Sequence, residues 1–275
     1  MPPTLHPLNE SFDWVGPTGR CRLLGAAELE RWNADGYFVL EDALDRRSVE
    51  DLAAAIDPFE DEMSQLLRSQ PGGRIFIADA EAITFTTHLV TKSPVARRFA
   101  AQRLLAELAG DLLGADVRLY WDQAVYKKPE SAKEFPWHQD NGYNFVEPQQ
   151  YLTCWIPLVD VTTANGCPWV VPGLHRLGTL EHWWTDTGWQ CLAEAPEAVP
   201  VETRAGSVVV FSSLTPHRTG PNLTSGVRKA YIVQFAPDGA ESVRVVPDGE
   251  RLRMPQDAPD RQFSVVRGGE VLPQP

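Results

Sequence analysis

The spacing of apolar residues along the chain changes near residue 114. Before that point apolar positions recur at every third or fourth residue, which is the period of an amphipathic helix. This spacing predicts helices over residues 25–36, 47–69 and 93–114. The second is expected either as one helix or as a pair broken near Pro58, and a brief strand is expected over 37–40.

After residue 114 apolar and polar positions alternate, which is typical of β-strands. The alternation predicts strands over residues 117–127 and 151–159, and two further strands at 208–211 and 229–233. Many short strands separated by Gly and Pro favour a sandwich or a barrel. We therefore expect an all-β core with flanking helices.

The strand over 151–159 has two different faces. One face is wholly apolar and consists of Leu152, Cys154, Ile156 and Leu158. The other face is mixed and carries Tyr151, Thr153 and Trp155. Because successive side chains of a strand point to opposite sides, we expect the apolar face to enter the core and the mixed face to look into a ligand cavity.

The length of 275 residues is compatible with a single domain. We expect an N-terminal arm over 1–25, a helical scaffold over 26–114, a barrel core over 115–236 and a C-terminal tail over 237–275. Within the core, residues 178–198 form an insertion with weak periodicity that contains Trp183, Trp184 and Trp189. It is expected either to cover the substrate like a lid or to pack on the outside of the barrel.

Composition narrows the possible partners. The chain is 43% hydrophobic and 23% charged, which is ordinary for a globular protein, and its net charge is −12. This charge argues against nucleic acid or an anionic membrane as the main partner, and mildly against a polyanionic substrate, although Lys127 and Lys128 could form a local basic patch. No run approaches the roughly 20 apolar residues of a membrane helix.

The N-terminus and the cysteines favour a cytoplasmic protein. The N-terminus has neither a basic stretch nor an apolar segment typical of a secretion signal. The four cysteines have no paired spacing, so reduced and mostly buried thiols are expected. No motif indicates an oligomeric state.

Two short segments far apart in sequence carry the candidate chemistry. His138 and Asp140 are two positions apart, so they lie on one face of an extended strand, and His217 can complete a triangle from a neighbouring strand. Two imidazoles and one carboxylate are the donor set of non-haem Fe(II) oxygenases. Arg228, eleven positions after His217, begins an apolar strand and is a suitable bidentate partner for a carboxylate.

Four sequence blocks resemble the phytanoyl-CoA hydroxylase family of Fe(II)/2-oxoglutarate dioxygenases. The blocks are Pro136 to Asp140, Trp155 to Cys167, Val171 to Arg176 and His217 to Ala230. The resemblance implies a double-stranded β-helix, the jelly-roll barrel also found in cupins. It also implies a metal centre of His138, Asp140 and His217, with molecular oxygen and 2-oxoglutarate as co-substrates.

The resemblance further implies how the co-substrate is held. Arg228 would pair with the distal carboxylate of 2-oxoglutarate, Thr219 would donate a hydrogen bond to it, and Thr153 and Trp155 would complete the pocket. The reaction implied is hydroxylation of an unactivated C–H of a small molecule, coupled to decarboxylation of 2-oxoglutarate to succinate. Relatives that halogenate have a small residue in place of the carboxylate, so Asp140 favours hydroxylation.

Substrate contacts are less clearly marked. The candidates are Gln123, Asn141, Tyr143, Arg218 and Trp183. No lysine occurs at 84–87, so specificity for an acyl-CoA is not supported.

Two other kinds of protein are compatible with the same residues. One is a cupin-like metal enzyme, an isomerase or hydrolase, that does not use 2-oxoglutarate. The other is a non-catalytic barrel that binds a ligand and uses the triad only for hydrogen bonds.

Overall fold

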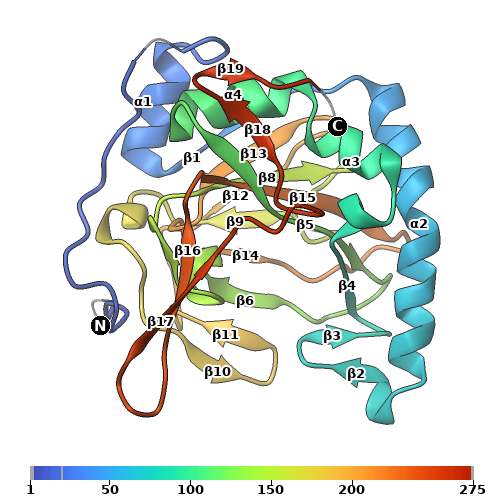
Figure 1. Cartoon of the computed structure of the whole chain (residues 1–275). Helices are drawn as coiled ribbons and strands as arrows, with labels where there is room; N and C mark the ends of the chain where they lie inside the picture. Colours follow the sequence, from blue (N-terminus) through green and yellow to red (C-terminus); the bar gives the residue numbers. More distant parts are fainter. Residues whose placement is uncertain (1–2, 20, 274–275) are drawn as a thin grey trace.

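The structure, a computed structural model, describes residues 3–19 and 21–273. Its centre is a pair of β-sheets packed face to face (Figure 1). The larger sheet has ten strands, of which β18 (Ser264–Arg267) and β19 (Glu270–Val271) branch from β5. The other eight follow one another in the order β1 (Tyr37–Leu40), β13 (Val208–Ser212), β8 (Leu152–Pro157), β15 (Arg228–Pro237), β5 (Val117–Lys127), β4 (Ile83–Thr87), β3 (Ala78–Asp79) and β2 (Arg74–Ile75).

The smaller sheet faces the middle of the larger one. Its four strands are, in order, β12 (Val199–Pro200), β9 (Pro168–Val170), β14 (His217–Thr219) and β6 (Phe135–His138). Apolar side chains from both sheets fill part of the space between them, among them Phe135, Trp155, Val170, Phe211 and Ile232.

Helices cover the outer face of the larger sheet (Figure 1). They are α1 (Ala26–Asp35), α2 (Arg46–Arg68), α3 (Pro94–Ala100) and α4 (Arg103–Leu113). Their buried residues pack against the apolar face of β8, which consists of Leu152, Cys154 and Ile156 and was predicted from the alternation. The strand prediction for residues 117–127 is confirmed over its whole length by β5.

The helix predictions are correct in position and differ in two details. Pro58 lies inside α2, which is one continuous helix rather than a pair. The predicted helix over 93–114 is instead two helices, because Gln102 has an extended backbone (φ −62°, ψ 150°) and is the N-cap of α4. The break lets α3 pack against α2 while α4 lies against β18.

Two stretches hold more strands than the sequence indicated. Residues 26–114 are not only a helical scaffold, because β4 joins the larger sheet beside β5, with Phe85 opposite Val125. The stretch 237–275 is more than a tail. Besides β18 and β19 it contains β16 (Glu241–Val245) and β17 (Arg251–Pro255), which form a sheet with β7 (Val146–Glu147).

Two hairpins lie beside each other at one edge of the molecule (Figure 1). One is β2–β3. The other is formed by β10 (Trp183–Thr185) and β11 (Gly188–Gln190), within the insertion predicted over 178–198. The remaining elements are short 3-10 helices at η1 (Pro71–Gly73), η2 (Leu89–Thr91), η3 (Asp140–Gly142) and η4 (Leu174–Leu177).

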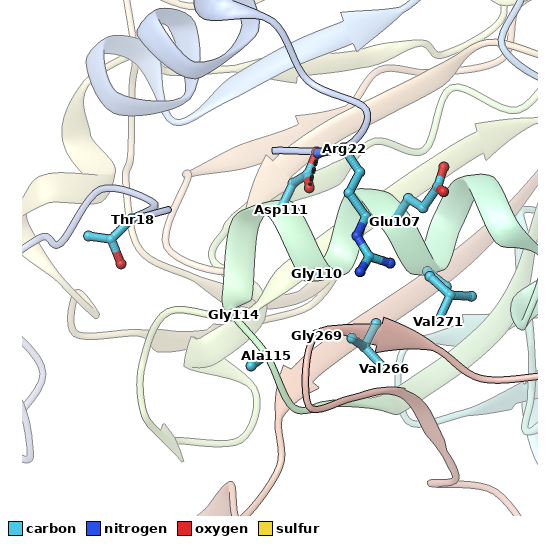
Figure 2. Close-up of a pocket in the computed structure, with 11 residues that line it drawn as sticks. Thr18, Arg22, Glu107, Gly110, Asp111, Gly114, Ala115, Val266, Gly269 and Val271 are labelled. Carbon is cyan, nitrogen blue, oxygen red and sulfur yellow. Dashed lines mark hydrogen bonds between the residues drawn. The ribbon is translucent and has the colours of Figure 1, made fainter. Parts of the chain in front are cut away.

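The N-terminal arm is fixed to α4 at a shallow groove (Figure 2). The Asp111 carboxylate accepts hydrogen bonds from the backbone N–H groups of Arg22, Leu23 and Leu24, at 2.8, 2.8 and 2.9 Å. The Arg22 guanidinium in turn pairs with Glu270. These contacts join the arm to α4 and to the C-terminal strands.

The four cysteines are free thiols, and three of them are buried, as the sequence predicted. Within residues 3–19 and 21–273, no helix combines the length and the apolar character that crossing a membrane requires.

Candidate metal centre

Strand pairing brings the two predicted histidine ligands together. His217 of β14 lies directly opposite His138 of β6, and their ring centroids are 4.1 Å apart. Asp140 follows two residues after His138, at the start of η3. Its Oδ1 is 3.9 Å from Nε2 of His138 and 3.8 Å from Nε2 of His217. Three potential ligand atoms thus surround one point within 4.8 Å of one another.

Backbone carbonyls fix the orientation of both imidazoles. Nδ1 of His138 lies 2.9 Å from the carbonyl oxygen of Pro136, and Nδ1 of His217 lies 3.0 Å from that of Thr215. With the proton on Nδ1, each ring donates there and presents a free Nε2 lone pair to the centre. Burial, followed by the nearby His217, lowers the pKa of His138 well below its usual value, which favours the neutral form that binds metal.

A hydrogen-bond chain orients the carboxylate. The Thr153 hydroxyl donates to Oδ2 of Asp140 at 2.5 Å and accepts from the Gln234 amide at 3.2 Å. Oδ1 therefore remains directed at the histidines. Thr153 was predicted to complete the co-substrate pocket. In the structure its hydroxyl is bound to Asp140, one of the three predicted metal ligands.

Arg228 is a fully buried cation that lacks an acidic partner within hydrogen-bond reach in the described part of the chain. One guanidinium nitrogen, Nη1, donates to the carbonyl of Val125 at 3.1 Å, while Nε and Nη2 have no hydrogen-bond partner among the residues that the structure describes. Burial lowers the pKa of this group to about 9. Buried donors without partners are costly, so this geometry is that of a site for an anion.

A small inner cavity joins Arg228 to the metal centre. The triad and Arg228 both line it, as do the other three residues predicted to hold the co-substrate, Thr153, Trp155 and Thr219. The centre of the Arg228 guanidinium lies 5.5 Å from the Trp155 ring centroid. The remaining walls are mostly apolar and come from β4, β5, β6, β9, β13 and β15.

A larger outer cavity of about 580 Å³ opens on the other side of the centre. It shares His138, Asp140, Phe85, Gln123 and Phe135 with the inner cavity. The metal centre therefore lies where the inner and the outer cavity, the two chambers of this site, meet.

Two of the five candidate substrate residues line these chambers. Gln123 lies between them, and Tyr143 lines the outer one. Asn141 does not: it is buried, its carbonyl oxygen accepts from the Val146 N–H at 2.9 Å, and its amide donates to Thr179. Asn141 thus holds the turn after Asp140.

Arg218 and Trp183 also lie outside both chambers. Arg218 occupies the strand position between His217 and Thr219, so alternation turns it to the opposite face, where it pairs with Glu134 at 2.6 Å. Trp183 is on the outer hairpin and is 44% exposed.

The two adjacent lysines do not form a basic patch. Lys127 is fully buried and donates to the backbone carbonyls of Thr219, Gly220 and Lys133. Lys128 forms an ion pair with Glu60 at 2.7 Å. Neither ammonium is available to a phosphate group, and Lys127 instead secures the strand that carries His217.

Several wall residues were missed by sequence reasoning. Gln234 lies six positions after Arg228 on the same face of β15, so the alternation was the signal that could have indicated it. Met63, Leu66 and Leu67 come from α2, and Ile75, Phe76 and Ile77 come from the β2–β3 hairpin. No local pattern marks these two elements as neighbours of the metal.

A two-histidine, one-carboxylate centre within facing β-sheets is the architecture of a jelly-roll non-haem oxygenase. The comparison with known proteins agrees: residues 32–230 match the model of the phytanoyl-CoA dioxygenase family. The chain therefore belongs to the phytanoyl-CoA dioxygenase family, as the sequence blocks predicted.

Related sequences include two bacterial oxygenases. Methylphosphonate hydroxylase of Gimesia maris is 26% identical over 216 residues, which are 76% of this chain and 79% of the relative. Ectoine dioxygenase of Bordetella parapertussis is 28% identical over 227 residues, which are 73% of this chain and 71% of the relative.

Solved structures confirm the predicted fold class. EvdO2 of Micromonospora carbonacea, solved with 2-oxoglutarate, has a TM-score of 0.65 and 24% identity, over 85% of this chain and 97% of its own. The epimerase SnoN, solved with Fe³⁺, α-ketoglutarate and a nogalamycin compound, has a TM-score of 0.67 and 23% identity, over 86% and 96%. The predicted cofactors are thus those of structural neighbours, and the donor set and free guanidinium of this chain fit them.

Proposed function

We propose that this protein is an Fe(II)- and 2-oxoglutarate-dependent oxygenase that hydroxylates an unactivated C–H of a small molecule. His138, Asp140 and His217 would hold the iron, since neutral imidazoles and a carboxylate suit this ion. When bound, iron and 2-oxoglutarate activate molecular oxygen, one atom of which enters succinate and the other the product.

The observation that carries the proposal is the pairing of two unlike sites in one small chamber. The triad lies at one side, and the buried Arg228 with two free N–H groups lies at another. A short dicarboxylate satisfies both, because one carboxylate can reach the metal and the other can accept from the guanidinium. Thr219 lines the same cavity, and its hydroxyl would donate to the same carboxylate.

The residues around the chamber have supporting roles. Thr153 and Gln234 hold Asp140 so that Oδ1 stays with the histidines. Phe85, Phe211 and Ile232 exclude water from the region where the co-substrate would lie. A dry surrounding strengthens the pairing of the guanidinium with a carboxylate.

Arg228 also argues for this function over a cupin-like isomerase or hydrolase. Such an enzyme shares the metal triad but has no use for a buried guanidinium, whose desolvation would then be uncompensated. The same residue argues against a non-catalytic barrel, in which the triad would only form hydrogen bonds. The carboxylate in the triad supports hydroxylation rather than halogenation.

Titration calorimetry of 2-oxoglutarate into the protein loaded with Mn(II) tests the proposal. Arg228→Gln is expected to weaken 2-oxoglutarate binding by at least about 30-fold, since losing one partner of a buried charge pair costs about 2 kcal/mol or more. Arg218→Gln, on the outward face of the strand beside the metal, is the matched control and keeps the affinity of the unchanged protein.

Succinate formation with Fe(II) and oxygen provides the catalytic readout. It is expected to require both iron and 2-oxoglutarate, and to fall with the binding loss in the Arg228 variant. Equal affinity of 2-oxoglutarate for the Arg228 variant and the unchanged protein would contradict the proposal.

A further inference from the structure

The outer cavity points to a class of substrate. We infer that the molecule oxidised is bulky and predominantly apolar, and that it carries no polyanionic group such as a phosphate ester or a CoA moiety. This inference rests on the proposed function, because it assigns the chamber next to the metal centre to the prime substrate.

The size and walls of the chamber indicate the bulk and polarity of the ligand. A volume of about 580 Å³ is that of a site for a drug-sized molecule. Most of its wall is aliphatic or aromatic, contributed by Met63, Leu66, Leu67, Ile75, Phe76, Ile77, Ala78, Phe85, Trp121, Phe135 and Tyr143. Such a wall gains free energy by burying apolar surface and offers little to a small charged molecule.

Charge excludes the polyanionic alternatives. The wall of the chamber contains two charged side chains, the ligand Asp140 and Arg244, which is exposed on β16. The nearby lysines are committed to other partners: Lys127 to backbone carbonyls and Lys128 to Glu60. A single cation at the rim does not balance several phosphate charges in a chain whose net charge is −12.

An aromatic stack joins the two hairpins at the mouth of the chamber. Phe76, at the tip of β2–β3, stacks on Trp184 of β10 with ring centroids 5.0 Å apart and planes at 25°. Trp184 contacts Trp189 of β11 edge to face at 5.5 Å, and the Arg74 guanidinium donates to the Asp186 carbonyl at 3.0 Å. The two hairpins therefore hold Phe76 in place.

Phe76 is unusual in two independent ways. Its φ of 52° lies in the left-handed region, which an aromatic residue adopts at a cost of roughly 1–3 kcal/mol. It is also 61% exposed although it lines the chamber. The exposed part of this strained side chain gains nothing from folding, whereas an apolar ligand in the chamber would cover it.

The polar groups of the chamber come from elements other than the β2–β3 hairpin. Gln123 lies beside the metal centre, and the Asn144 amide donates to the Tyr120 hydroxyl at 3.0 Å. The substrate is thus bound with its apolar body toward the hairpins and a hydrogen-bonding group toward the iron. The oxidised carbon lies near that group.

A neutral fluorescent probe, N-phenyl-1-naphthylamine, tests the chamber directly. Its binding to the protein saturated with Mn(II) and 2-oxoglutarate is followed by fluorescence. Phe76→Gly is expected to weaken binding about tenfold, because a large apolar contact is lost. Glycine accepts the left-handed conformation, so this variant is expected to fold with unchanged or higher thermal stability. Leu223→Ser, at a side chain 62% exposed in another loop, is the matched control with unchanged binding.

Equal probe affinity in the Phe76 variant and the unchanged protein would overturn the inference. So would failure of the unchanged protein to bind the probe. Calorimetry of 2-oxoglutarate on the same samples separates the two proposals: intact co-substrate binding with no probe binding defeats the substrate class alone.

A substrate panel read as succinate release gives the second arm. We expect uncharged polycyclic and long-chain compounds to stimulate release, and small zwitterions, phosphonates and CoA thioesters to have no effect. Stimulation by the charged compounds and not by the apolar ones contradicts the inference while leaving the oxygenase assignment intact.

Discussion

The two faces of the larger sheet use the same strands for different purposes. On the outer face, Leu152, Cys154 and Ile156 of β8 are buried under the helices, and the polar group of Asp122 is hydrogen-bonded by Tyr231. On the inner face, Thr153 is committed to a metal ligand and Arg228 keeps two donors without partners. The outer face thus stabilises the fold, while the inner face keeps polar groups available for ligands.

The difference shows how one strand can serve both needs. Because side chains alternate, neighbouring residues of β8 face either the helices or the chamber. Substitutions on one face should therefore change stability, and substitutions on the other should change binding. Single substitutions at the metal centre and on each face test this separation.

Removal of a metal ligand is expected to abolish activity. His217→Ala should lose high-affinity Mn(II) binding and iron-dependent succinate formation, since two ligands hold a divalent ion poorly. The control is His88→Asn, which replaces a histidine outside the triad, and asparagine tolerates its left-handed backbone (φ 56°). Metal affinity is measured by calorimetry, and folding by circular dichroism. Retained metal binding in the His217 variant would refute the site.

A matched pair of isoleucines separates stability from function. Ile156→Ala, on the outer face, should lower the free energy of unfolding by about 2–5 kcal/mol. Ile232→Ala, on the chamber side, should cost less, because it enlarges a cavity that already exists. Chemical denaturation measures both. Equal losses in the two variants would show that the faces are not distinct.

Asp122 predicts a pH dependence on the outer face. Burial raises the pKa of this carboxyl from 3.8 to about 6, so its stabilising contribution is present below pH 3.8 and is lost as pH rises through 6. Asp122→Asn should therefore be more stable than the unchanged protein by about 3 kcal/mol above pH 7. The gain should vanish near pH 4. A constant difference between the two proteins across this range would contradict the interpretation.

The smallest expected effect concerns the support of the carboxylate ligand. Thr153→Val removes the hydroxyl that orients Asp140, and metal affinity should fall by about 10- to 100-fold, as for other groups that hold a metal ligand in place. Thr86→Val is the control, because the buried Thr86 hydroxyl has no hydrogen-bond partner within residues 3–19 and 21–273. Metal titration of both variants is the measurement, and equal affinities would argue against the role of Thr153.

Features that depend on neighbours along the chain were predictable from the sequence. Alternation identified β5 and the two faces of β8, because a strand sends successive side chains to opposite sides. The spacing of His138 and Asp140 indicated a shared metal, and Arg228 was conspicuous as a cation entering an apolar strand. The resemblance to a family supplied the barrel and the co-substrate.

Features that depend on distant segments were decided by the tertiary structure. Asn141, Arg218 and Trp183 seemed suitable for substrate contact, but strand alternation and local hydrogen bonds turned Arg218 and Asn141 away from the chambers, while Trp183 lies on the outside of its hairpin. The free N–H groups of Arg228, the meeting of α2 and β2–β3 around one chamber, and the stacking of β10 on Phe76 arise only when separate elements pack. Periodicity describes which way a side chain points from its own backbone, whereas the partner it meets there is set by the packing of the whole chain.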